Sequence, residues 1–228
     1  MKEIYHLLKI KIAIFFIALV IFAVILISWG LDDIDGFLAH PARMMLLFLL
    51  LIQFIILEFI PWGWILTRLP ASPSDDNKLI AFIGAMGILL FLMISPFSDR
   101  NEWMQLGGGD VLRYFGVFLF TLGCIIANWA SIHLYQKLVI QYHRNQQGYQ
   151  LVTTGPFKYV RHPRDFGIIL IFLSIPLIFI SSLGFFLAIF SIAGLFERIA
   201  REEQVLRQEL GDEWLDYVQK TKCLVPWV

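Results

Sequence analysis

The stretch "FGIILIFLSIPLIFISSLGFFLAIFSIAGLF", residues 166–196, decides how the chain folds. It contains two apolar runs, 166–181 and 183–196, which are joined by the short link "SSLG". Both runs are near the lower limit for a membrane-spanning helix, which needs about twenty apolar residues. We therefore expect a tight helical hairpin in the membrane, with a kink at Pro176 in its first arm.

A polar segment lies on each side of this hairpin. The first is "HRNQQGYQLVTTGPFKYVRHPRDFG", residues 143–167, and the second is "ERIAREEQVLRQELGDEWLDYVQKTKCLVPWV", residues 197–228. A hairpin returns the chain to the side that it left, so the two polar segments should meet at its open end. Residues that are distant in the sequence are then expected to form one site.

The rest of the chain is also strongly apolar. Apolar residues make up 58% of the sequence and charged residues only 16%, whereas about one quarter is charged in soluble domains. Four further runs are long enough to cross a membrane: 10–29, 44–66, 79–97 and 111–134. We predict an all-α polytopic membrane protein with about six transmembrane helices, the C-terminal hairpin and a cytoplasmic amphipathic helix. A four-span region, 1–134, and a C-terminal region, 135–228, would form one integrated membrane domain.

Charge gives an orientation and excludes some partners. The 18 basic and 18 acidic residues cancel, so no overall field would attract nucleic acid. If the N-terminus is inside, all basic residues except Arg43, Arg100 and Arg113 fall in inner segments. Because cytoplasmic loops are enriched in Lys and Arg, we expect a multi-pass protein of a bacterial inner membrane with both termini in the cytoplasm.

The cysteines and histidines do not suggest a metal site. Cys124 and Cys223 lack the spacing of a disulfide framework or a zinc site, and the five histidines are scattered. We therefore expect no metal. Polar residues at membrane depth are functional candidates. For Glu58 a structural and a functional role both stay open, whereas His133 and Lys137, on one helix face, are explained more simply by snorkelling.

The pattern of the second polar segment predicts an amphipathic helix that continues out of the membrane. Two acid-before-base pairs have the favourable i,i+4 order: Glu197 with Arg201, and Glu203 with Arg207. Gly211 would end this helix and Asp212 would cap a further short one. A membrane-skimming tail held by ion pairs is the alternative interpretation of this pattern.

Together the two polar segments offer complementary chemistry for a zwitterionic ligand. Arg161 and His162 could bind a carboxylate, and Glu202 or Glu203 an ammonium. Gly155 would let the backbone approach the ligand closely. These residues suit a small amino-acid-like cofactor.

The same residues carry a family resemblance. "LVTTGPFKYVRHPRDFG" followed, after the hairpin, by "ERIAREEQVLRQELGDEWLDYVQKTKCLVPW" resembles the integral-membrane methyltransferases related to isoprenylcysteine carboxyl methyltransferase and phospholipid N-methyltransferase. The match covers about the last eighty residues, whereas the first four spans are similar only in being hydrophobic.

The resemblance implies a cytoplasmic S-adenosylmethionine pocket and a lateral opening for a lipidic acceptor with a carboxylate, amine or thiol. Arg201 would orient the acceptor, Glu203 or His162 could accept a proton, and Pro226 with Tyr217 would cover the pocket. By position, the cofactor-binding residues would be Gly155, Pro156, Phe157, Arg161, His162, Glu202 and Tyr217.

Departures from the family pattern give weight to a second enzyme class, although "LVTTGPF" looks more like the methyltransferases, which stay the preferred interpretation. Asp165 stands where the family usually has tyrosine, and "GDEWLDY" matches the Gly-x-x-Trp-x-x-Tyr motif of membrane sterol reductases, which use NADPH and share the Arg-His-Pro motif. The other alternative is a non-catalytic scaffold that binds anionic lipid headgroups through its basic residues. Those residues would be Lys137, Lys158, Arg161 and Arg164.

Overall fold

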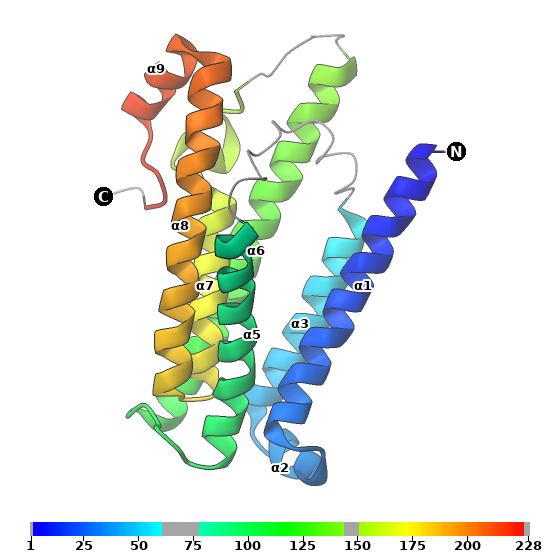
Figure 1. Ribbon diagram of the computed structural model, residues 1–228, viewed down its shortest axis with the longest axis vertical. Coiled ribbons are helices and arrows are strands. Elements are labelled where there is room, and N and C mark those ends of the chain that lie inside the picture. Colours follow the sequence, from blue (N-terminus) through cyan, green and yellow to red (C-terminus); the bar gives the residue numbers. More distant parts are fainter. Residues whose placement is uncertain (1, 61–77, 144–150, 226–228) are drawn as a thin grey trace.

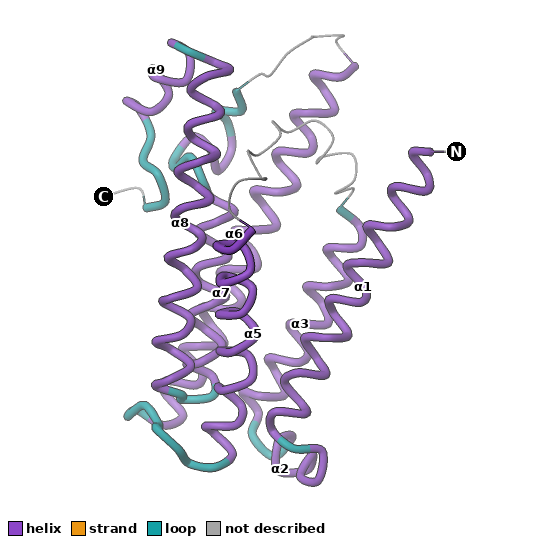
Figure 2. The backbone as a smooth tube through the Cα atoms, viewed as in Figure 1, coloured by secondary structure: helices purple, strands orange, loops and turns teal. Residues whose placement is uncertain are grey.

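The computed structural model describes residues 2–60, 78–143 and 151–225. Apart from isolated bridges, the regular structure in these ranges is helical (Figure 2). In chain order the elements are α1 (Lys2–Trp29), η1 (Leu31–Asp33), α2 (Ile34–Leu38), α3 (Pro41–Phe59), α5 (Lys78–Arg100), α6 (Gly109–His143), η2 (Gly155–Lys158), α7 (Pro163–Ile178), α8 (Ser182–Leu210) and α9 (Asp212–Lys220).

Five helices in the described ranges, α1, α3, α5, α6 and α8, are long and apolar enough to cross a membrane. The remaining predicted span corresponds to α7, which has 16 residues and rises about 24 Å, less than the hydrocarbon thickness of about 30 Å. The prediction of an all-α polytopic membrane protein is confirmed. The predicted span 44–66 continues past the end of α3 into residues outside the described ranges.

The helices alternate in direction and form two groups (Figure 1). The first group, α5 to α8, is held by the contacts of α6 with α7 and of α5 with α8. α1 and α3 lie side by side and pack on this group through α5 and α6. The open end of the α7–α8 hairpin, together with α9, lies at the top of Figure 1, and the turns from α5 to α6 and from α7 to α8 lie at the bottom.

Glycines bring α6 and α7 into close contact. A Cβ atom added to Gly167 would lie 2.6 Å from the carbonyl oxygen of Gly123, and one added to Gly123 would lie 2.6 Å from that of Gly167. Small residues allow helix backbones to approach in this way in membranes, where packing rather than the hydrophobic effect drives association. The first arm of the hairpin is therefore fixed on α6.

The turn of the hairpin is tighter than its sequence suggests. α7 ends at Ile178 and α8 begins at Ser182, so the turn comprises residues 179–181 and not the whole "SSLG" link. Ser181 caps α8 by accepting a hydrogen bond from the Gly184 amide at 3.1 Å. Pro176 lies in the last turn of α7 and is fully buried.

A buried charge cluster fastens this closed end of the hairpin. Asp99, at the end of α5, accepts hydrogen bonds from Arg43 of α3 at 2.9 Å and from Arg113 of α6 at 2.7 and 2.5 Å. Arg113 also donates to the carbonyl of Ile178 at 2.8 Å. Arg43 stacks on Trp29, with its guanidinium carbon 4.4 Å from the ring centroid. The cluster joins both helix groups.

At the other end, α8 continues well beyond the apolar part of the hairpin. Its 29 residues rise about 44 Å, so about a third of the helix, at its C-terminal end, projects past a bilayer core of about 30 Å. Gly211 ends the helix with φ 54°, as predicted. The expected capping role of Asp212 is wrong, because Gly211 is the N-cap residue of α9 and Asp212 is its first helical residue.

Candidate functional site

The two polar segments meet at the open end of the hairpin. The amides of Arg161 and His162 donate to the carbonyls of Lys222 and Cys223 at 2.8 and 3.0 Å, and Val160 forms a parallel bridge with Lys222. This short pairing places the Arg-His-Pro motif between the C-terminal segment and α8. The predicted meeting of distant residues is thus present in the structure.

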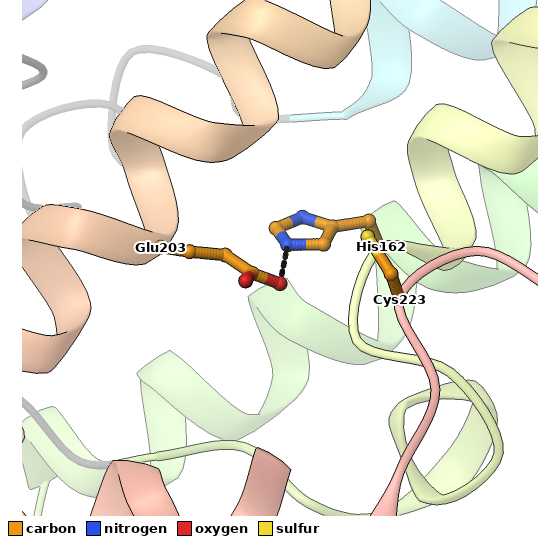
Figure 3. Close-up of side chains that lie close together, drawn as sticks. All are labelled: His162, Glu203 and Cys223. Atoms are coloured by element: carbon orange, nitrogen blue, oxygen red, sulfur yellow. Dashed lines mark hydrogen bonds and ion pairs between the residues drawn. The ribbon is translucent and has the colours of Figure 1, made fainter.

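Glu203 of α8 is the acidic partner of both basic residues in the motif. Its Oε1 accepts a hydrogen bond from Arg161 Nε at 2.7 Å. The same oxygen lies 3.1 Å from His162 Nε2, as Figure 3 shows. Arg161 also donates to the carbonyl of Thr221 at 2.6 Å. The expected pair of Glu203 with Arg207 is wrong, because the i,i+4 rule considers one helix surface and omits the partners that the hairpin brings in.

His162 has a second carboxylate on the other side of its ring. Its Nδ1 lies 3.6 Å from Asp165 Oδ2, and Asp165 also forms an ion pair with Arg198 of α8. Burial alone would lower the pKa of His162, but the contacts with Asp165 and Glu203 and the nearby charge of Glu202 raise it to about 9. His162 is therefore an imidazolium at neutral pH, held by carboxylates from two helices.

The pKa of Asp165 is lowered for the complementary reason. Its burial opposes ionisation, but the contact with His162 and the charges of Arg198 and Arg164 outweigh that effect. The structure thus gives a role to the residue that departs from the family pattern: Asp165 joins α7 to α8 and fixes one face of His162. From the sequence alone, Asp165 could be described only as a replacement for the tyrosine that the family usually has at this position.

The Gly-Pro-aromatic turn forms η2. Gly155 adopts φ 62°, in the left-handed region that glycine favours, and Pro156 is buried at the start of the turn. The carbonyl of Phe157 accepts a hydrogen bond from the Tyr217 hydroxyl at 2.6 Å. Burial raises the pKa of Tyr217 to about 12, so the hydroxyl stays protonated and donates this bond at neutral pH.

α9 is held against the loop by its aromatic face. Trp214 and Tyr217 are both buried, and their ring centroids lie 5.7 Å apart. Tyr217 thus contacts the η2 loop, and its expected role as a cover of the cofactor pocket stays a prediction. Pro226, the other expected residue of the pocket cover, lies outside the described ranges.

Arg201 and Glu202 occupy different surroundings on α8. Arg201 donates to Glu197 at 2.6 Å, which confirms the predicted i,i+4 pair. The Glu202 carboxylate lies within 4.8 Å of ligating atoms of both His162 and Asp165. No hydrogen bond or ion pair of Glu202 is present within the described ranges, so its carboxylate is the available acid of this cluster.

Among the residues that the structure describes, two groups of side chains have ligating atoms within 4.8 Å of one another: His162, Glu203 and Cys223, and His162, Asp165 and Glu202. The first group is shown in Figure 3. The guanidinium of Arg161 shares Oε1 of Glu203, and protonated His162 has no lone pair for a metal. The charges of the site thus suit an organic zwitterion better than a cation, and the expectation of no metal stays a prediction.

Comparison with known proteins relates the residues that build this site to a family. Residues 111–213, from α6 to the start of α9, match the family model for phospholipid methyltransferase. Methanethiol S-methyltransferase 1 of Bradyrhizobium diazoefficiens is 32% identical over 166 residues, which cover 71% of this chain and 58% of that protein. Protein-S-isoprenylcysteine O-methyltransferase B of Arabidopsis thaliana is 27% identical over 161 residues, which cover 68% of this chain and 76% of that protein.

The matched part of the chain spans little more than half the length of the first of these relatives. The part matched by the family model includes the η2 loop, the hairpin and all of α8. The chain is therefore related to the integral-membrane methyltransferases that include the phospholipid methyltransferases and isoprenylcysteine carboxyl methyltransferase.

Proposed function

We propose that this protein transfers a methyl group from S-adenosylmethionine to a lipidic or membrane-embedded acceptor at the cytoplasmic face of a bacterial inner membrane. The observation that carries the proposal is the joining of Arg161 and His162 to α8 at the open end of the hairpin, within the part of the chain related to membrane methyltransferases. The excess of basic residues on this side supports a cytoplasmic site.

The residues present fit the amino-acid part of the cofactor. The Arg161 guanidinium uses Nε for Glu203 and Nη1 for Thr221, so its Nη2 group is the donor proposed for the cofactor carboxylate. Protonated His162, whose ring nitrogens face Asp165 and Glu203, adds positive charge beside it, and the Glu202 carboxylate is suited to the ammonium. Gly155, Pro156 and Phe157 would line the side of the site formed by η2, with Tyr217 of α9 as a cover.

When bound, S-adenosylmethionine supplies a methyl group on a positively charged sulfur, which an acceptor atom takes while the carbon–sulfur electron pair returns to sulfur. The protein's task is to align the two reactants and exclude water. A carboxylate acceptor needs no base, whereas an amine or thiol must lose a proton.

The side chains differ in their suitability for that proton transfer. His162 is already protonated at neutral pH, and Glu203 is engaged by Arg161 and His162. We therefore assign Glu203 a positioning role in place of the catalytic one expected from the sequence. Arg201, which is held by Glu197, stays the proposed acceptor-orienting residue.

A cleft between α3 and α6 offers a route for an apolar acceptor. It has a volume of about 260 Å³ and lies on the turn of α6 that also carries His133, a residue that contacts the η2 loop. Its lining is mainly apolar and consists of Ile56, Phe59, Ile60, Ile132, Tyr135 and Gln136. The relatives act on methanethiol and on isoprenylcysteine, so a thiol and a carboxylate are the first acceptor groups to test.

Calorimetric titration of the detergent-purified protein with S-adenosylmethionine, S-adenosylhomocysteine and NADPH tests the proposal. We expect saturable binding of both adenosyl ligands, weakened by His162→Ala and by Glu202→Ala but unchanged by Glu209→Ala, an exposed position of the same helix. Binding of NADPH alone would indicate a reductase. Binding of none, with retention of anionic lipid by Glu202→Ala, would indicate a scaffold.

A further inference from the structure

The η2 loop rests on a histidine of a neighbouring helix. Nε2 of His133, on α6, lies 3.0 Å from the Thr154 hydroxyl, immediately before the Gly-Pro-aromatic turn. The His133 ring also faces Phe157, with centroids 6.4 Å apart and planes inclined by 31°. A single side chain of α6 therefore contacts residues on both sides of Gly155.

The fit between His133 and Gly155 leaves no room for another atom. A Cβ atom added to Gly155 would lie 2.7 Å from the His133 ring. The φ of 62° at Gly155 turns the backbone so that its α-carbon approaches the ring directly. The ring thus sets how closely this loop lies to α6.

The Thr154 hydroxyl is used in an unusual way. Threonine at the start of a helical turn commonly accepts a hydrogen bond from a backbone amide of that turn. Thr154 is the N-cap residue of η2 but makes no such bond, and its hydroxyl is paired with His133. Local capping is therefore replaced by a contact between the loop and α6.

We propose that His133 is a positioning residue, which holds the loop 155–157 in its ligand-binding conformation through Thr154 and Gly155. This inference rests on the proposed function, because it assigns the loop to an adenosyl ligand. It replaces the snorkelling explanation for His133, since the ring bonds to the loop. It also makes α6, outside both polar segments, part of the cofactor site.

Three substitutions separate the two contacts of His133 in titrations with S-adenosylhomocysteine. His133→Ala removes both contacts and should weaken binding about tenfold, the effect of losing roughly one good hydrogen bond. His133→Gln keeps a polar group for Thr154 and should recover part of the affinity, whereas His133→Phe keeps only the ring. Ile125→Ala, at an exposed position of the same helix α6, is the matched control and should bind as the wild type does.

A second pair of variants tests the fit at Gly155. Gly155→Ala should weaken binding strongly in the wild-type background, because its Cβ meets the His133 ring. The same substitution should weaken binding less in His133→Ala, where the ring is absent, although the backbone strain persists. Equal effects in both backgrounds would overturn the inference. Thermal unfolding of each variant checks that the bundle stays folded.

The possible results distinguish the inference from the function on which it rests. If the wild type binds S-adenosylhomocysteine and the folded His133→Ala variant binds it equally well, the inference alone fails. If the wild type binds no adenosyl ligand, the proposed function fails and the inference fails with it. Weaker binding by His133→Ala with partial recovery by His133→Gln supports both.

Discussion

Asp165 Oδ2 lies 3.6 Å from Nδ1 of His162, whereas Glu203 Oε1 lies 3.1 Å from the other ring nitrogen, Nε2. The imidazole is therefore bracketed by two carboxylates, one from α7 and one from α8. Such a residue gains stability by carrying its proton, because each carboxylate favours the charged form. The site thus holds a fixed cation where the sequence suggested a histidine of either charge.

The stability of the protein should consequently depend on the protonation of His162. Its pKa is raised from 6.5 to about 9, so the folded state binds this proton more tightly than the unfolded state. The contribution is complete below pH 6.5 and is lost as the pH rises to about 9. We expect the melting temperature in detergent to fall across this interval, and the fall should be smaller in His162→Gln.

The comparison isolates His162, because Asp165 has a lowered pKa and stays ionised throughout the interval. Asp165→Asn should lie between the wild type and His162→Gln, since it removes one of the two carboxylates. Parallel melting curves for all three proteins between pH 6.5 and 9 would contradict the raised pKa of His162.

Tyr217→Phe should loosen the cover over the η2 loop. The substitution keeps the ring that packs on Trp214 but removes the hydroxyl that donates to the Phe157 carbonyl at 2.6 Å. A hydrogen bond of this kind contributes about 1 kcal/mol, which corresponds to roughly a fivefold loss of S-adenosylhomocysteine affinity. Titration measures this loss, and an unchanged affinity would show that the loop does not depend on α9.

Asp99→Asn should destabilise the whole bundle without touching the candidate site. It leaves Arg43 and Arg113 buried beside a neutral amide, and breaking a buried ion pair in this way costs about 3–5 kcal/mol. Thermal unfolding in detergent measures the effect. Asp32→Asn is the control, because the ion pair of Asp32 with Arg100 lies at the surface and should contribute little.

Gly167→Ala should separate α7 from α6. The added methyl group would lie 2.6 Å from the Gly123 carbonyl, and overpacking of this kind costs about 1–3 kcal/mol. Gly194→Ala on α8 is the matched control, since nothing lies within 4 Å of its Cβ position and alanine favours a helix. A melting temperature for Gly167→Ala equal to that of Gly194→Ala would contradict close packing of the two helices.

The membrane spans and the C-terminal hairpin were predictable because they depend on properties that are local in the sequence. Apolar length defines the spans, and a link of a few residues between two of them requires a hairpin. Because the chain folds back in this hairpin, Arg161 and His162 lie next to the polar end of α8. The end of α8 at Gly211 is local as well, because glycine alone adopts its φ without strain.

The hydrogen-bond and ion-pair partners of the charged side chains were not predictable, because they depend on distances between helices. Glu203 has a basic residue four positions later on its own helix, yet it pairs with Arg161 and His162 across the hairpin. Asp165 showed only a departure from a family pattern, and its partner Arg198 lies 33 positions away. From the sequence, Asp99 and Arg113 would be assigned to exposed loops outside the membrane, whereas both side chains are buried.

The carbonyl groups of Lys222 and Cys223 accept hydrogen bonds from the amides of Arg161 and His162, so residues 222 and 223 help to hold the Arg-His-Pro motif in place. A protease that cuts before Lys222 would leave every helix intact but remove the carbonyl groups that hold the Arg-His-Pro motif. We expect such a trimmed protein to keep its membrane-spanning helices but to bind S-adenosylhomocysteine more weakly than the whole chain does. An affinity tag is therefore best placed away from residues 222 and 223.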